Sequence, residues 1–369
     1  MNFRYFSIAP SLFLLWFAAF PPPPSVPNAI AREASVPQVF SHGDTLTIPS
    51  EFGAFVSDLA LTPDDHLLAA AIITPDWYGP GTVKVWDLSE NRLLYEFDNR
   101  SHHLATSPDG QWLVGAEDGG KPTIESIGVI EIWDANTGER RYRFNGNEME
   151  FGGVNAIAIS PDSQTLVSGS DFWQSYDDTS GSNLQIWNLQ TGELRTTLDG
   201  HPGAVKAVAI SPDGTILASG GGMQPIGNFG DSQIRLWDLE TGEMLRTLEG
   251  HSDEVTALTI SPDGRLLASG SQDSSIKLWN LQTGKLMQVL IGHTASVESL
   301  EISRDGKRLI SGSQDTTIRV WNLRTGERLQ TLTEDAGTGF AISRKGGMLV
   351  TSEHNDQQNE NRIHLWRDR

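Results

Sequence analysis

The chain has 369 residues, of which 38% are hydrophobic, and it contains 37 glycines, 18 prolines, 11 tryptophans and no cysteine. This composition is too apolar for a disordered protein. The lack of cysteine excludes disulfides, thiolate zinc sites, iron–sulfur clusters and cysteine nucleophiles. The net charge of −20 repels phosphate backbones, so we expect no nucleic acid among the partners.

Residues 1–31 have the pattern of a cleaved export signal. Arg4 supplies a positive charge, an apolar run covers residues 5–20, and an A-x-A cleavage motif lies at residues 29–31. We therefore expect cleavage after Ala31 and a protein that is periplasmic or extracellular. The alternative is an uncleaved membrane anchor at residues 5–20, although this run contains Pro10 and is shorter than the ~20 residues of a spanning helix.

From about residue 55 the chain repeats one pattern seven times. Each copy contains a Ser-Pro-Asp-Gly turn, or a degraded form of it, and then a tryptophan. In the clearest copy, residues 255–290, the segments VTALTI, LLASGS, IKLW and KLMQVL alternate apolar and polar side chains, which is typical of short strands. The seven tryptophans are Trp86, Trp133, Trp187, Trp237, Trp279, Trp321 and Trp366.

This repeat resembles the WD-repeat family of β-propellers. Gly-His precedes the first strand at residues 200–201, 250–251 and 292–293, and Trp-Asp or Trp-Asn ends the third strand in the first six copies. The resemblance implies an all-β, seven-bladed propeller with four-stranded antiparallel blades in residues 32–369. The expected blades cover about 55–98, 102–145, 154–199, 204–249, 255–290, 297–332 and 338–369.

Copy 7 holds only three strands, because the sequence ends three residues after Trp366. We expect an N-terminal strand from residues 36–48 to complete that blade, since a ring has no free sheet edge only when both chain ends share a blade. Two stretches are candidates for this strand, namely Val36–Phe40 and Thr45–Ile48.

The resemblance also implies a hydrogen-bonded tetrad in each well-formed blade. The indole N–H would donate to a serine hydroxyl, which bonds an imidazole whose tautomer an aspartate fixes. A His–Ser–Asp triple also fits a catalytic site, but three copies at equivalent positions favour a structural role. The expected tetrads are His201, Ser219, Asp231 and Trp237; His251, Ser269, Asp273 and Trp279; and His293, Ser311, Asp315 and Trp321.

The loops between the second and third strands vary in length. In five copies they carry about 5–9 more residues than in the compact copies 5 and 6, and in a four-stranded meander they all leave at one end. Aromatic residues in such loops are typical binding anchors, forming one site or two; alternatively, they pack on one another as a separate cluster. The candidates are Trp77, Tyr78, Phe172, Trp173, Tyr176 and Phe229.

Metal and histidine motifs are weak in this sequence. Asp171, Asp177 and Asp178 could gather oxygen ligands for Ca²⁺, but EF-hand spacing is missing. We therefore predict no metal and no cofactor. Four histidines lack the spacing of metal ligands and are expected on the surface or in loops, namely His102, His103, His354 and His364.

The sequence predicts a non-catalytic scaffold that binds a protein or peptide partner through the face that carries the long loops. The alternative is a propeller enzyme, or a protein that binds a sugar, metal or other small ligand in the axial channel. That alternative requires acids, histidines or arginines clustered at the channel mouth, and the sequence register predicts no such cluster.

Overall fold

The computed structural model divides into two units, Met1–Val36 and Pro37–Arg369. It describes residues 45–49, 54–74, 81–117, 128–145, 153–170, 184–222, 231–332, 336–342, 348–355 and 360–367. The predicted export signal and the candidate strand Val36–Phe40 lie outside these residues. Among the described residues, no helix is long and apolar enough to span a bilayer.

The first three blades each contain four strands that are consecutive in the chain. Blade 1 consists of β2 (Phe55–Leu61), β3 (Leu67–Ile73), β4 (Gly81–Asp87) and β5 (Arg92–Asp98). Blade 2 consists of β6 (His103–Thr106), β7 (Trp112–Ala116), β8 (Val129–Asp134) and β9 (Arg140–Asn145). Blade 3 consists of β10 (Val154–Ile159), β11 (Thr165–Ser170), β12 (Leu184–Asn188) and β13 (Leu194–Leu198).

The next three blades repeat the same order. Blade 4 consists of β14 (Val205–Ile210), β15 (Ile216–Gly221), β16 (Ile234–Asp238) and β17 (Met244–Leu248). Blade 5 consists of β18 (Val255–Ile260), β19 (Leu266–Ser271), β20 (Ile276–Asn280) and β21 (Leu286–Leu290). Blade 6 consists of β22 (Val297–Ile302), β23 (Arg308–Ser313), β24 (Ile318–Asn322) and β25 (Arg328–Leu332).

Blade 7 joins the two ends of the second unit. It consists of β26 (Ala336–Ile342), β27 (Met348–Asn355), β28 (Glu360–Arg367) and the N-terminal β1 (Thr45–Pro49), in the order β1-β28-β27-β26. β1 pairs antiparallel with β28, and its buried Leu46 and Ile48 pack with Trp86 of blade 1. The predicted closure by an N-terminal strand is therefore confirmed, and Thr45–Ile48 is the candidate that supplies the strand.

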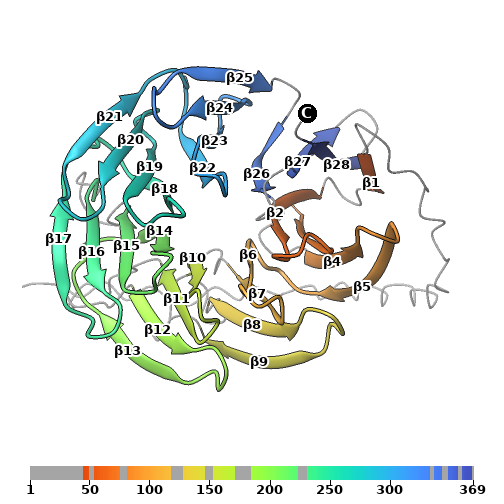
Figure 1. Cartoon of the computed structure of the whole chain (residues 1–369). Coiled ribbons are helices and arrows are strands. Elements are labelled where there is room, and N and C mark those ends of the chain that lie inside the picture. Colours follow the sequence, from red (N-terminus) through yellow and green to blue (C-terminus); the bar gives the residue numbers. More distant parts are fainter. Residues whose placement is uncertain are drawn as a thin grey trace, which may run out of the picture. The chain divides into compact units, whose positions relative to one another are not determined.

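The seven antiparallel sheets of the described residues confirm the predicted seven-bladed propeller. The first strand of each blade faces the centre of the ring and contacts the first strand of the next blade, from β2 to β26 and back to β2 (Figure 1). The fourth strands, such as β9, β13, β17 and β21, form the outer rim (Figure 1). The ring therefore brings side chains from separate blades together along its axis.

The Ser-Pro-Asp-Gly turns are fixed by side-chain and backbone hydrogen bonds. In blade 5, Ser261 Oγ donates to Asp263 Oδ1 at 2.6 Å and accepts from the backbone N–H of Leu266 at 2.9 Å. The fourth turn residue is left-handed, with φ of 69° at Gly264. In the degraded turn of blade 1, Asp65 takes the same conformation with φ of 62°, which costs an L-residue about 1–2 kcal/mol.

The hydrophobic core lies between blades. In blades 1–6 the tryptophan of the third strand packs against the last strand of the preceding blade. The ring centroids of Phe97 and Trp133 lie 4.4 Å apart, and Leu290 packs with Trp321. The second strands approach the next blade so closely that a Cβ on Gly270 would lie 2.7 Å from Val297 Cγ1. The apolar surface buried at these contacts holds the blades together. Its burial stabilises the fold by about 25 cal/mol per Å² of apolar surface removed from water.

Candidate functional site

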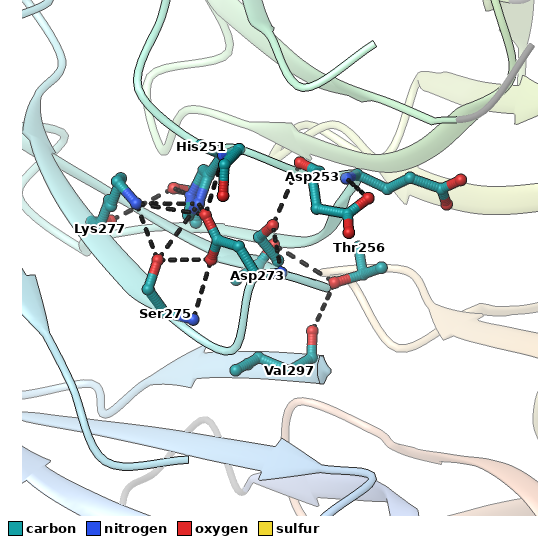
Figure 2. Close-up of polar contacts among 12 residues, drawn as sticks. His251, Asp253, Thr256, Asp273, Ser275, Lys277 and Val297 are labelled. Carbon is teal, nitrogen blue, oxygen red and sulfur yellow. Dashed lines mark hydrogen bonds and ion pairs between the residues drawn. The ribbon is translucent and has the colours of Figure 1, made fainter. Parts of the chain in front are cut away.

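In blade 5, the four residues of the expected tetrad lie together in one hydrogen-bonded chain, of which Figure 2 labels His251 and Asp273. Trp279 Nε1 donates to Ser269 Oγ at 2.8 Å, and the same oxygen lies 2.7 Å from His251 Nε2. His251 Nδ1 lies 2.9 Å from Asp273 Oδ2. The glycine of the Gly-His pair is needed because a Cβ on Gly250 would lie 3.0 Å from the indole ring of Trp279.

Blades 4 and 6 contain the same chain at equivalent positions. Ser219 Oγ accepts from Trp237 Nε1 at 2.8 Å and lies 2.7 Å from His201 Nε2, whose Nδ1 lies 2.8 Å from Asp231. In blade 6, Trp321 Nε1 donates to Ser311 Oγ at 2.9 Å, and the same oxygen lies 2.7 Å from His293 Nε2. His293 Nδ1 lies 2.8 Å from Asp315 Oδ2. The structure thus brings together all twelve residues of the three expected tetrads.

The protonation states follow from burial and charge. Burial lowers the pKa of His201, and the positive charge of Arg235 lowers it further, so the imidazole is neutral. Burial alone would raise the pKa of Asp231, but the hydrogen bond to His201 and the charge of Arg235 outweigh it, and the pKa falls below its usual value. The neutral ring therefore donates Nδ1–H to a carboxylate and accepts the serine proton at Nε2.

A basic side chain accompanies each of the three tetrads, and the expected tetrads did not include these basic residues. Lys277 Nζ donates to Ser275 Oγ at 2.8 Å and lies 3.4 Å from Asp273 Oδ2 (Figure 2). Arg235 and Arg319 occupy the equivalent positions and pair with the aspartates of blades 4 and 6. The motif that could have revealed them is the basic residue two positions before each tryptophan in IRLW, IKLW and IRVW.

These tetrads are structural and not three catalytic triads. Ser269 and Ser311 are both 0% exposed, and each serine oxygen already accepts an indole N–H. A nucleophilic serine needs a free approach for a substrate carbonyl, and the tryptophan occupies that space.

Other blades depart from the tetrad. In blade 7, Trp366 Nε1 donates to Thr351 Oγ1 at 3.0 Å, so a threonine replaces the serine. His364 was expected on the surface or in a loop, but it lies half-buried in β28, 2.8 Å from Glu353 Oε2 and 3.1 Å from Thr45 Oγ1. That expectation is wrong, because ring closure covers β28 with β1.

The long segments between second and third strands leave the propeller at the end that carries the links between blades. In blade 4, Gly222 N–H donates to the carbonyl of Ala204, and in blade 5 Gln272 N–H donates to Glu254. Part of the extra length in blade 7 extends β27 and β28 to eight residues each. All six candidate aromatics lie outside the described residues, namely Trp77, Tyr78, Phe172, Trp173, Tyr176 and Phe229.

The propeller axis contains a cavity of about 430 Å³ among the described first strands. Blades 1–6 each contribute a polar side chain to its lining, and four of these side chains are ionisable. These side chains are Asp58, His103, Asn155, Lys206, Thr256 and Glu298, and the serines Ser57 and Ser299 line the cavity as well.

Several polar side chains of this axial cavity connect neighbouring blades. Asn155 Nδ2 donates to the carbonyl of Val205 at 3.3 Å, and Asn155 Oδ1 accepts from Lys206 Nζ at 3.1 Å. Thr256 Oγ1 donates to the carbonyl of Val297 in the next blade (Figure 2). The lining is therefore held in place by the same bonds that close the ring.

Asp58 is the most perturbed group of the axial cavity. Its Oδ2 accepts the backbone N–H of Leu104 in blade 2 at 2.8 Å, and its Oδ1 accepts that of Leu59 at 2.8 Å. Burial raises the pKa of Asp58 to about 7, although these two hydrogen bonds act in the opposite direction. The group is therefore close to half-protonated near neutral pH.

The sequence register predicted no cluster of acids, histidines or arginines at the channel mouth, whereas the described first strands place Asp58, His103 and Glu298 around the axial cavity. His103, expected on the surface or in a loop, lies in β6 and lines the same axial cavity. Across the described ranges between residues 45 and 367, however, no three acidic or histidine side chains are grouped so that they could hold a metal ion. The Ca²⁺ candidates Asp171, Asp177 and Asp178 lie outside those ranges.

Comparison with known families agrees with this geometry. The family model for "WD domain, G-beta repeat" matches residues 138–179, 192–238, 242–280 and 284–322. Each of the last three matches contains one of the three complete tetrads.

Several characterised or catalogued proteins are similar to parts of the chain. It is 41% identical over 90 residues to the small ribosomal subunit protein RACK1y of rice (Oryza sativa), which covers 23% of this chain and 24% of that protein. It is 29% identical over 222 residues to an uncharacterized WD repeat-containing protein of Synechocystis, covering 58% and 56%, and 27% identical over 215 residues to Protein groucho of Drosophila melanogaster, covering 55% and 24%. The matches thus span between about a quarter and just over half of these relatives.

Proposed function

Since the chain is a seven-bladed β-propeller built from WD repeats, we propose that it is an exported, non-catalytic scaffold that binds a protein or peptide partner. The partner-binding surface is the end of the ring that carries the long segments between second and third strands. Export rests on the signal-like residues 1–31.

One observation carries this proposal. The segments of variable length all leave at one end of the ring, whereas the strands and the short turns of the other end repeat with little change. Loops on a rigid support are where proteins place binding residues, because they tolerate changes that a packed sheet does not. The aromatic side chains in the segments of blades 1, 3 and 4 suit the anchoring of a protein partner.

Affinity capture from an envelope extract of the source cells tests the proposal. The purified protein is expected to retain a partner, and the double variant Trp77→Ala/Trp173→Ala is expected to lose it while its free energy of unfolding stays unchanged. The matched control is Met244→Ala, since Met244 is an exposed apolar residue on the outer strand β17, 54% exposed. Unchanged capture by the double variant contradicts the proposal, and a large loss of stability indicates that the aromatics pack on one another.

The axial cavity supports a second candidate function, the binding of a small polar ligand. Asp58, His103, Lys206 and Glu298 place ionisable groups of both kinds, acidic and basic, around one cavity on the axis. A screen of small anions, cations and sugars by thermal shift tests this function with Lys206→Met as the comparison variant. A ligand that stabilises the protein and not the variant supports it, and no stabilisation by any ligand contradicts it.

A further inference from the structure

Besides the axial cavity, the propeller has a groove at the end of the ring opposite the long segments. This groove has a volume of about 590 Å³ and lies between blades 5 and 6. Its walls come from the Ser-Pro-Asp-Gly turn of blade 5, the equivalent turn of blade 6, and the turn after β24. These turns join first to second and third to fourth strands, so they lie away from the links between blades.

Three exposed arginines surround this groove, namely Arg265, Arg304 and Arg324. Within the continuous stretch 231–332, none of their guanidinium groups forms a hydrogen bond or an ion pair. Three arginines without an ion pair thus stand around one groove in a chain of net charge −20, and, together with the hydrogen bond from Ser261, the charge of one of them, Arg265, helps to lower the pKa of Asp263. Their five-donor planar groups match carboxylates in bidentate geometry.

Two carboxylates also line the groove, but the turns already use them. Asp263 Oδ1 accepts from Ser261 Oγ and from the backbone N–H of Arg265, and Asp305 Oδ1 has the same two kinds of donor in blade 6. Three arginines against two aspartates leave the lining with an excess of positive charge.

Apolar side chains line the groove beside these charged ones. Leu266 and Leu323 line it, and Met287 of β21 lies at its edge with 62% of its surface exposed. Leu286 of β21 and Ile291, which follows this strand, are also exposed, at 45% and 73%. Apolar side chains gathered in this way are typical of a protein-binding surface.

The equivalent groove between blades 3 and 4 provides an internal comparison. There Glu240 replaces Arg324, Pro212 stands in the turn position of Arg304, and Arg195 replaces Met287. Arg195 donates to Thr165 Oγ1 at 3.1 Å, so this arginine is engaged. That groove has one arginine against Asp162, Asp213 and Glu240 and is acidic, so the basic, apolar character is not a general property of the repeat.

We propose that the groove between blades 5 and 6 binds an acidic peptide segment in which an apolar side chain stands next to a carboxylate. The carboxylates pair with Arg265, Arg304 and Arg324, and the apolar side chain packs on Met287 and Leu266. This inference rests on the proposed scaffold function but concerns the opposite end of the ring. The propeller would then join two partners, one at each end.

A labelled peptide, Asp-Leu-Asp-Leu-Glu, tests the groove by fluorescence anisotropy with the full chain. The double variant Arg265→Gln/Arg324→Glu introduces residues that blades 3 and 4 carry at the same positions, so it is expected to fold. We expect its Kd to rise at least about tenfold, since two charge-assisted contacts are lost. Met287→Thr is expected to weaken binding about threefold to tenfold, and raising NaCl from about 50 to about 300 mM is expected to weaken it further.

The matched control is Lys285→Glu, which makes the same charge change as Arg324→Glu on an exposed turn outside the groove, at a position where blade 4 has Glu243. We expect less than about a twofold change for it. Equal Kd values for the double variant and the original protein overturn the proposal, as does an equal loss with Lys285→Glu or equal binding of Asp-Ser-Asp-Ser-Glu. Capture through the long-segment end is independent of these substitutions, so the two proposals fail separately.

Discussion

Removing the serine of one tetrad tests the role of these buried networks. In Ser269→Ala, the indole N–H of Trp279 and Nε2 of His251 both lose the oxygen that now lies 2.8 and 2.7 Å from them. Each buried group without a partner costs about 1–3 kcal/mol, so the loss of a partner for two groups is expected to lower the free energy of unfolding by about 2–6 kcal/mol. Urea unfolding followed by tryptophan fluorescence and circular dichroism measures the loss.

Two further variants show whether the loss comes from the network. Ser168→Ala in blade 3 removes the acceptor of Trp187 Nε1, and the sequence has Glu150 where blades 4–6 have the tetrad histidine, so we expect a smaller loss of about 1–2 kcal/mol. In a cycle with Trp279→Phe, the second substitution is expected to cost less than the first by about 1 kcal/mol, because the unpaired indole N–H is gone. Equal losses for Ser269→Ala and Ser168→Ala, together with strict additivity in the cycle, would refute the reasoning.

Three other predictions follow from the fold. The double variant Leu46→Ala/Ile48→Ala removes the buried side chains of β1 and is expected to lower the melting temperature of the whole ring, at about 2–5 kcal/mol per residue; calorimetry showing an unchanged transition would contradict closure by β1. Gly306→Ala is expected to cost about 1 kcal/mol in urea unfolding, since φ is 66° and no atom lies within 4 Å of the added Cβ; no loss would show that the turn relaxes. The pKa of Asp58 is raised from 3.8 to about 7, so the folded state holds the proton more tightly, and its contribution to stability falls by up to about 4 kcal/mol as pH rises from 4 through 7. Unfolding of Asp58→Asn across that pH range is expected to lack this decline, and a parallel pH profile for the two proteins would contradict it.

Short-range features of the blades were predictable from the sequence because they depend on neighbouring residues. The Ser-Pro-Asp-Gly turn is determined by four positions. A tryptophan at the position of Trp279 indicates a buried third strand in each copy of the repeat in which it recurs. The sequence could not decide between Val36–Phe40 and Thr45–Ile48, since both have strand-forming side chains. Pairing with β28 decides it, because only the ring brings residues 45–49 beside 360–364.

The axial cavity could not be predicted because its members belong to different blades. Asp58 and Lys206 look like ordinary polar positions in alternating strands, and only the closed ring turns them toward one space. Arg235, Lys277 and Arg319 could have been found, since each stands two residues before a tryptophan. They were missed because a basic residue in a strand is usually solvated, whereas here each pairs with a buried aspartate.

The most direct test of the scaffold function is site-specific photo-cross-linking in the source cells. A photoreactive residue at Tyr78, in the long segment of blade 1, is compared with one at Glu193, on an exposed turn at the other end of blade 3. Binding through the long-segment end predicts a discrete adduct with another protein from position 78 and none from position 193. Adducts from position 193 with none from position 78 would contradict it.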